Sequence, residues 1–286
     1  MGFFVYLCSM NHTEALQQIY PRNEARAIYR LVMEERFGLS QTDLLLGKDK
    51  ELSAEAQADL QNIMLRLLSG EPVQYVLGTA RFCERDFHVA PGVLIPRPET
   101  EELVEHLSEI LPTSSKVLDI GTGSGCIAIT LALRGHSVCA FDISEKALEI
   151  AKMNAKNLGA DVEFFLEDIL HPSPSDRQWD AIVSNPPYIC QSEAKEMEEH
   201  VLAHEPHLAL FVPDSDPLLF YRHIALYARR HLAGGGLLAF EVNRAFARQT
   251  EILLQELCFA KTEIISDQFG NQRMVFATKP KTNPPL

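Results

Sequence analysis

The hydrophobic pattern of the chain changes near residue 70. Residues 13 to about 70 repeat apolar positions at helical spacing and contain no run typical of a strand. This pattern predicts a helical bundle in a domain of residues 1–72. Its helices are expected to start at the capping residues Asn23, Ser40 and Ser53, with Gly70 after the last one. The bundle has no cluster of residues suited to catalysis, so we interpret it as a module for partner recognition; a purely stabilising cap is the alternative.

Residues 73–96 no longer show a sustained repeat of apolar positions at helical spacing. Short extended pieces are predicted at 75–77, 81–82 and 87–89, interrupted by glycine and proline, which together indicate a β-hairpin linker. A second domain is predicted over residues 97–286. It starts with a helix at Pro98 whose apolar side chains form one stripe, typical of a helix that packs on a sheet.

After Pro112, short apolar runs alternate with helical patterns. The alternation predicts an α/β fold, a Rossmann-like and mostly parallel seven-stranded sheet with helices on both faces. The predicted strands are 116–120, 137–141, 162–166, 179–183, 237–242, 263–266 and 274–278, and the helices are 126–133, 144–158, 218–232 and 246–258. Ligands of such sheets bind beyond the carboxyl ends of the strands.

Composition narrows the class of protein. The chain carries 39 acidic and 26 basic residues, a net charge of -13, which argues against broad binding to a phosphate backbone and favours a protein or small-molecule partner. Its six cysteines include no Cys-x-x-Cys pair; we expect reduced thiols, no metal site and a cytoplasmic protein. The apolar opening Met1–Cys8 lacks the basic region of a signal peptide, and no run is long enough to span a membrane. We expect a monomer.

A glycine-rich loop follows the first predicted strand and opens a helix. In Gly121-Thr122-Gly123-Ser124-Gly125 the glycines let backbone N–H groups approach a ligand. Asp142 ends the next strand, where a carboxylate accepts hydrogen bonds from both ribose hydroxyls of a nucleoside; a helix cap before Ser144 is the alternative. The glycine spacing departs from that of dinucleotide-binding loops, so a nicotinamide cofactor fits poorly.

Two further acidic positions lie at strand ends. Asp119 is placed to bond the glycine loop or the ammonium group of a cofactor. Asp168-Ile169, after the third strand, is placed to bond an adenine amino group and to cover the edge of its ring. For Asp168, a solvated loop position is the alternative.

The run Ser184-Asn185-Pro186-Pro187-Tyr188 ends an apolar strand in a rigid corner. Proline fixes φ and has no N–H, so the Pro186 carbonyl and the Asn185 side-chain oxygen form a pair of acceptors for the two hydrogens of one planar NH2 group. Tyr188 offers a flat face for the amide or ring that carries this group. An ordinary loop is the alternative. Combined with the nucleoside site, the corner fits S-adenosylmethionine and methyl transfer to nitrogen.

At this point the chain resembles a known family. Residues 117–128 resemble motif one of class I methyltransferases, and four further runs are similar to those of the PrmC/HemK family over residues 14–279. The runs are Gly70–Tyr75, Leu94–Glu101, Val183–Ile189 and Glu205-Pro206-x-x-Ala209-Leu210. The resemblance implies a class I fold and S-adenosylmethionine-dependent methylation of the glutamine side chain in the Gly-Gly-Gln motif of bacterial peptide chain release factors. Asn243 departs from the glycine usual at its position, which leaves the turn after the fifth strand open.

The resemblance also implies roles for the site residues. Asn185 accepts from the substrate amide and lies near the methionine part of the cofactor, the Pro186 carbonyl takes the second hydrogen, and Pro187 and Tyr188 complete the substrate site. Arg97 is expected either to reach toward the mouth of the site or to form a surface ion pair.

Two other functions fit parts of the sequence. A methyltransferase acting on an adenine or guanine amino group needs a similar corner, but it is expected to carry a basic surface that this acidic chain lacks. A catalytically silent factor that only binds release factors is the second alternative, and the intact glycine loop and corner argue against it. We expect no direct nucleic-acid or membrane partner.

Overall fold

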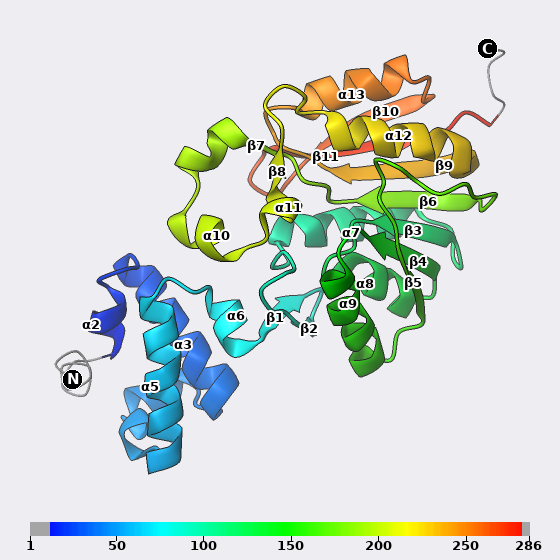
Figure 1. Ribbon diagram of the computed structural model, residues 1–286. Coiled ribbons are helices and arrows are strands. Elements are labelled where there is room, and N and C mark those ends of the chain that lie inside the picture. The colour runs from blue at the N-terminus through cyan, green and yellow to red at the C-terminus, as the bar shows by residue number, and fades with distance from the viewer. Residues whose placement is uncertain (1–11, 282–286) are drawn as a thin grey trace. The chain divides into compact units, whose positions relative to one another are not determined.

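The computed structural model describes residues 12–281 as two compact units (Figure 1). Residues 12–79 and the distant segment Glu198–His204 form the helical unit. Ala80–Met197 and residues 205–281 form the sheet unit. The opening Met1–Cys8 lies outside the described residues.

Apolar side chains at helical spacing form the core of the helical unit, as the sequence predicts. Leu16, Val32, Met33 and Leu67 are fully buried there. The elements are α2 (His12–Leu16), α3 (Arg22–Phe37), α4 (Gln41–Leu45), η1 (Lys48–Glu51), α5 (Ala54–Leu68), α6 (Val73–Leu77) and α10 (Glu199–His204).

The predicted helix caps are confirmed at two of three positions. The Ser40 side chain accepts from the backbone N–H of Asp43 in a capping box, and the Ser53 side chain accepts from that of Ala56. Asn23 is not a cap, because α3 begins one residue earlier, directly after Pro21. A proline has φ already fixed in the range that a helix start requires.

The extended piece predicted at residues 75–77 is wrong, because these residues lie in the short helix α6. Arg66 explains the helix: its guanidinium donates to the carbonyls of Tyr75 and Val76 at 3.1 Å, and it also pairs with Glu71. These bonds satisfy carbonyls that a five-residue helix leaves open. The predicted hairpin follows as β1 (Thr79–Phe82) and β2 (Arg85–His88).

The seven-stranded sheet is confirmed. Its order is β10-β11-β9-β6-β3-β4-β5, with only β11 antiparallel to its neighbours. The strands are β3 (Lys116–Ile120), β4 (Ser137–Asp142), β5 (Val162–Leu166), β6 (Trp179–Ser184), β9 (Leu232–Glu241), β10 (Lys261–Ser266) and β11 (Gln272–Thr278).

Helices cover both faces of this sheet (Figure 1). One core combines α7 (Pro98–Ile110), α8 (Cys126–Leu133) and α9 (Glu145–Leu158) with strand side chains such as Val117 and Val183. The other combines α12 (Leu219–His231) and α13 (Ala247–Glu256) with Leu118 and Ile182. Neighbouring residues of one strand thus enter opposite cores, which is why most residues of the central strands are apolar.

The strand order reverses at β3. The chain moves outward from β3 to β4 and β5, then returns with β6 to the other side of β3. Helices diverge at such a reversal and leave a crevice beyond the carboxyl ends of the strands, so the topology itself prepares a ligand site.

The segment after the Asn-Pro-Pro-Tyr corner holds structure that the sequence pattern does not predict. Its elements in the sheet unit are β7 (Ile189–Cys190), η2 (Gln191–Glu196), α11 (His207–Leu210) and β8 (Phe211–Val212). The two strands pair with each other in parallel and are two residues long, too short to carry a period in sequence.

Candidate active site

A cavity of about 330 Å³ lies at the reversal point of the sheet. Apolar side chains such as Phe141, Ile143 and Leu208 make up much of its wall. Most predicted site residues also line it: Gly121, Thr122, Gly123, Ser124, Asp142, Asp168, Ile169, Asn185, Pro186 and Pro187. An apolar wall with a few convergent polar groups is typical of a small-molecule site.

The glycine loop wraps one end of this cavity in a conformation that suits glycine. Gly121, Gly123 and Gly125 have φ of +73°, +57° and +82°, a region that side chains disfavour. The N–H groups of Gly121 and Thr122 donate to the Phe141 carbonyl at 2.9 and 3.1 Å, which fixes the loop against the end of β4.

Gly125 has a packing role and does not line the cavity. A Cβ atom at this position would lie 2.8 Å from Ile129 Cδ1 and 3.1 Å from Ala151 Cβ. Its bare Cα therefore lets the start of α8 approach α9 closely.

Asp142 is held in place by backbone donors. Its Oδ2 accepts from the N–H of Gly123 and its Oδ1 from that of Ser144, both at 2.9 Å. The helix cap itself is Ser144, whose hydroxyl accepts from Ala147, so Asp142 is not the cap of α9. Burial raises the pKa of this carboxyl. A fixed carboxylate beside the glycine loop is the arrangement that recognises ribose hydroxyls.

Asp119 lies behind the loop, fully buried, and is not a wall residue. Its Oδ2 accepts from Thr122 Oγ1 at 2.6 Å, so of its two predicted contacts the bond to the loop is confirmed. Burial raises the pKa of Asp119 to about 7. A nearby cation would stabilise its ionised form.

Asp168 and Ile169 line the cavity at the end of β5. Asp168 Oδ1 accepts from the backbone N–H of Leu170 at 2.9 Å, and Oδ2 lies 2.9 Å from His171 Nδ1. These contacts hold the carboxylate, and the Ile169 side chain beside it is buried.

The Asn-Pro-Pro-Tyr corner begins where β6 ends. Ser184 Oγ donates to the Ile120 carbonyl at 2.7 Å, so the ends of β6 and β3 are tied together. Asn185 Nδ2 donates to Thr100 Oγ1 at 3.1 Å. Tyr188 does not line the cavity: its ring packs on a buried core and its hydroxyl donates to Glu241 Oε1 at 3.1 Å.

Arg97 forms an ion pair and does not line the cavity. Its guanidinium contacts Glu205, whose side chain is buried and also accepts from the N–H of Ile95 at 3.2 Å. Pro96 and Pro206, beside the two partners, are wall residues. The ion pair therefore joins two segments that border the cavity.

Two families of known proteins match the sequence. Residues 11–78 match the PrmC N-terminal domain, and residues 98–209 match the Methyltransferase small domain. The release factor glutamine methyltransferase of Bacteroides thetaiotaomicron is 46% identical over 269 residues, 93% of this chain and 97% of that protein. The protein of that name from Flavobacterium psychrophilum is 43% identical over 92% of this chain and 94% of its own length.

The chain belongs to the release factor glutamine methyltransferase family. The resemblance to the PrmC/HemK family is thereby confirmed. Two solved structures share the fold. The 16S rRNA N2 G1207 methyltransferase of T. thermophilus has a TM-score of 0.52 at 20% identity, covering 70% of this chain and 49% of its own. A methyltransferase from Pyrococcus furiosus has a TM-score of 0.51 at 17% identity, covering 80% and 100%. The predicted class I fold is confirmed.

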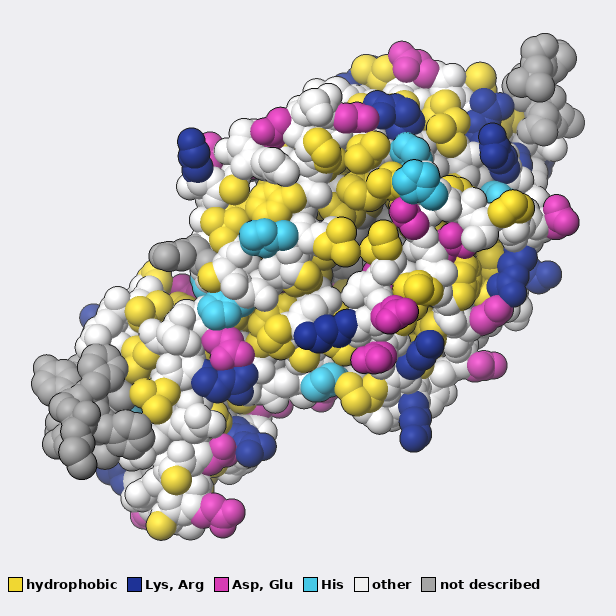
Figure 2. Space-filling model, in the orientation of Figure 1, with side chains coloured by type: hydrophobic (Ala, Val, Ile, Leu, Met, Phe, Trp, Pro, Cys, Tyr) yellow, Lys and Arg dark blue, Asp and Glu magenta, His cyan; other side chains and the backbone are white. Residues whose placement is uncertain are grey.

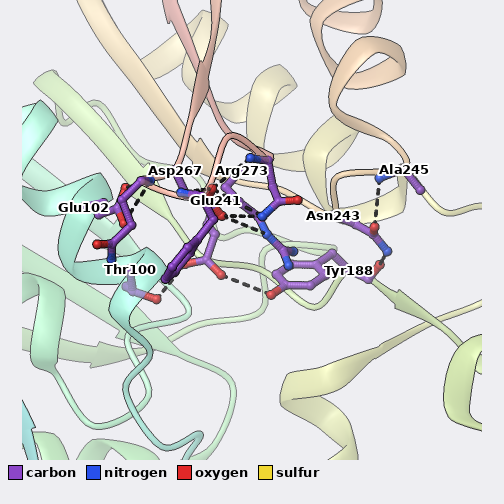
Figure 3. A network of polar contacts seen from close by, with 11 residues as sticks. Thr100, Glu102, Tyr188, Glu241, Asn243, Ala245, Asp267 and Arg273 are labelled. Atoms are coloured by element: carbon purple, nitrogen blue, oxygen red, sulfur yellow. Dashed lines mark hydrogen bonds and ion pairs between the residues drawn. The ribbon is translucent and has the colours of Figure 1, made fainter. Parts of the chain in front are cut away.

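The structure of this family member adds polar residues that the sequence analysis missed. Thr100 and Glu241 are buried and hydrogen-bonded to each other at 2.6 Å, beside the corner (Figure 3). Glu241 ends a strand just as Asp142 does, and this position in the sequence could have marked it as a candidate site residue. Thr100 faces the apolar side of a helix and gave no signal of its own.

Asn243, the departure from the family pattern, closes the turn after β9. Its Nδ2 donates to the Tyr188 carbonyl and to Glu193, all at 3.2 Å, and its Oδ1 accepts from the N–H of Ala245 at 3.0 Å (Figure 3). The side chain thus ties the end of the fifth parallel strand to the corner.

Two features are absent from residues 12–281. In this part of the chain, no helix has the length and apolarity needed to cross a membrane. The same residues contain no group of three or more His, Cys, Asp or Glu side chains arranged to hold a metal ion.

Proposed function

We propose that this protein transfers a methyl group from S-adenosylmethionine to the side-chain amide nitrogen of the glutamine in the Gly-Gly-Gln motif of peptide chain release factors. The observation that carries the proposal is the setting of Asn185. Its NH2 group is bound to Thr100, which leaves its oxygen as an acceptor beside Pro186 in the cavity of the glycine loop. Membership of the family supplies the substrate class.

The residues present fit the cofactor. The carboxylate of Asp142 suits the ribose hydroxyls, and Asp168 with Ile169 suits the adenine amino group and ring edge. The glycine loop, with buried Asp119 behind it, forms the polar end of the cavity, while Phe141 and the other apolar wall residues suit the flat base. S-adenosylmethionine bound there supplies an electrophilic methyl group.

The corner orients the nucleophile. An amide nitrogen is a poor nucleophile because its lone pair is delocalised, and the hydrogen bonds from its two hydrogens to Asn185 Oδ1 and the Pro186 carbonyl raise its electron density. The same two acceptors fix the plane of the amide and aim the nitrogen at the methyl group. As the nitrogen takes the methyl group, the bond between that group and the sulfonium sulfur would break, its electron pair going to sulfur. The nitrogen then loses one hydrogen as a proton to water. Tyr188 supports the corner from the side.

The proposal assigns recognition of the protein partner to the helical unit. This unit has a cavity of its own, whose wall includes the polar side chains of Arg26, Arg30 and Asp49. The proposal also includes action in the cytoplasm as a monomer. On the face of the molecule shown in Figure 2, Lys and Arg side chains of the sheet unit are scattered among Asp and Glu. That distribution supports a protein substrate over a nucleic acid, because backbone binding needs clustered positive charge.

Mass spectrometry tests the proposal directly. Purified protein, S-adenosylmethionine and unmodified release factor should yield one added methyl group on the peptide containing Gly-Gly-Gln. The matched control is a release factor with Glu in place of that glutamine, which should gain none. Methylation of undermethylated DNA or RNA in place of the release factor would favour the nucleic-acid alternative. Cofactor binding without any transfer would favour the silent factor.

A further inference from the structure

Asn185 is the end of a hydrogen-bonded chain that starts at a buried carboxylate. Its Nδ2 donates to Thr100 Oγ1 at 3.1 Å, and Thr100 Oγ1 donates to Glu241 Oε2 at 2.6 Å. The other oxygen of Glu241 accepts from the Tyr188 hydroxyl at 3.1 Å (Figure 3). The chain joins α7, the end of β9 and both ends of the corner.

The chemistry of the three groups gives the chain a direction. An ionised carboxylate only accepts hydrogen bonds, so both Thr100 and Tyr188 must donate to Glu241. The Thr100 hydroxyl has one hydrogen, and that hydrogen is spent on Glu241. Thr100 can then offer Asn185 only a lone pair, so the NH2 group of Asn185 must face Thr100 and its oxygen must face away.

We propose that Glu241, acting through Thr100, fixes the orientation of the Asn185 amide so that the site presents an acceptor and selects a substrate with an NH2 group. This inference rests on the proposed function and deepens it. Glu241 is a positioning residue, because it does not line the cavity. Thr100 lines the cavity wall, and the role that this inference gives it is to hold the Asn185 amide.

Burial holds the hydrogen-bonded chain in one arrangement. Thr100 and Glu241 are 3% and 1% exposed. At such low exposure an unpaired polar group is costly, because little solvent reaches it to replace a lost partner. A reversed amide would place Asn185 Oδ1 against the Thr100 lone pairs, so the observed orientation is the one that satisfies every member.

The same geometry makes the hydrogen-bonded chain of Asn185, Thr100 and Glu241 sensitive to acid. Burial raises the pKa of Glu241, and the charge of Glu99 on α7 adds to the shift. The hydrogen bonds from Thr100 and Tyr188 and the charge of Arg273 on β11 oppose it, and the net pKa is about 6. A protonated Glu241 can donate to Thr100, whose hydrogen is then free to donate to Asn185 Oδ1. The amide would turn its NH2 group toward the substrate, where two NH2 groups repel. Activity is therefore expected to fall as the pH drops through about 6.

A matched pair of substitutions at Thr100 tests the chain. Thr100→Val keeps the shape and removes the hydroxyl, whereas Thr100→Ser keeps the hydroxyl. On release factor, the Val variant should lose about 10-fold or more in kcat, because a misoriented acceptor misplaces the nucleophile. The Ser variant should recover most of this loss, and cofactor Kd should stay within about threefold in both, which also verifies folding. Wild-type kcat in Thr100→Val overturns the inference.

The pH profile provides the second test. Glu241→Gln carries no titrating carboxyl, so its kcat should be low at every pH. Its plot of kcat against pH should also lack the acid limb, the fall in activity near pH 6 that is expected for the wild type. Glu99→Gln is the control: it removes a neighbouring negative charge, so the limb should move to lower pH while kcat at pH 8 is retained. An unchanged acid limb in Glu241→Gln contradicts the role of its carboxylate.

A readout without substrate separates this inference from the proposed function. Wild-type protein that fails to methylate release factor refutes the proposed function alone. The side-chain NH2 signals of Asn185 in ¹H–¹⁵N NMR spectra still report on the chain. They should shift in Thr100→Val, return in Thr100→Ser and titrate near pH 6 in the wild type but not in Glu241→Gln. The inference is refuted if the chemical shifts of these signals change neither in Thr100→Val nor with pH.

Discussion

Asn154 Nδ2 donates to the Ser124 carbonyl at 2.9 Å, so a residue of α9 supports the glycine loop from behind. The same side chain donates to the His88 carbonyl at 2.9 Å and accepts from the His88 N–H at 2.8 Å. It is 1% exposed. One buried amide thus connects the cofactor loop to the hairpin.

Replacing Asn154 with Ala should affect both stability and ligand binding. The change leaves buried backbone groups of Ser124 and His88 without partners, which should lower the free energy of unfolding by roughly 2–3 kcal/mol. Cofactor affinity should fall several-fold because the loop loses its support. Denaturant unfolding and calorimetric titration measure the two effects. Asn157→Ala, on the same helix and away from the loop, should be near neutral; equal losses in both variants would refute the role of Asn154.

Two glycines of the loop should respond differently to Ala. Gly123 and Gly125 both have positive φ, so each substitution costs about 1–2 kcal/mol of backbone strain. At Gly125 the new Cβ also meets Ile129 at 2.8 Å and Ala151 at 3.1 Å, whereas at Gly123 nothing lies within 4 Å. Gly125→Ala should therefore cost a further 1–3 kcal/mol, roughly, in unfolding free energy. Gly123→Ala should act mainly on cofactor affinity, since this residue lines the cavity.

Gly159→Ala is the control for strain alone. Gly159 has φ +71° at the end of α9, a Cβ atom added there would meet nothing within 4 Å, and the residue has no place in the cavity wall. It should lose stability as Gly123→Ala does and keep cofactor affinity. If Gly125→Ala were no less stable than Gly159→Ala, the close packing of α8 on α9 would be refuted.

Asn185→Ala should abolish methyl transfer and largely preserve cofactor binding. The substitution removes one of the two acceptors that hold the substrate amide, an effect expected to lower kcat by about 100-fold or more. Cofactor affinity should change by no more than several-fold, because the glycine loop and Asp142 remain. Transfer of a labelled methyl group and equilibrium binding measure the two quantities. Near-normal turnover in this variant would discard the mechanism.

Asp119 should make the stability of the cofactor-free protein depend on pH. Burial raises its pKa to about 7, whereas the unfolded chain has a pKa of about 3.9. Between these values the folded protein holds the extra proton, so its unfolding free energy should decline as pH rises from about 4 to 7. Asp119→Asn should remove this part of the decline.

Urea unfolding of both proteins between pH 4 and 8 measures the contribution of Asp119. The pKa values of Asp142 and Glu241 are also raised, so a residual decline in Asp119→Asn is expected. The informative quantity is the difference between wild type and variant at each pH. If that difference were constant across the range, Asp119 would not carry the charge change.

The prediction from sequence succeeded where the signal is local. The seven strands, the two serine caps and the glycine loop are each encoded in a few neighbouring residues, by period, by capping chemistry or by φ. It failed at α6, where the apolar residues 75–77 suit a strand or a helix equally well. Arg66, outside that stretch, decides the outcome by bonding the carbonyls of the short helix.

Sequence alone determined the order of elements, the parallel sheet with its crevice, and the residues at its strand ends. Only the tertiary structure decided how their side chains are held. Thr100 meets Asn185 across 85 positions and Glu241 across 141, and Arg97 meets Glu205 across 108. Such pairs leave no period in the sequence, because they form only when separate elements pack and exclude the water that would otherwise satisfy each polar group.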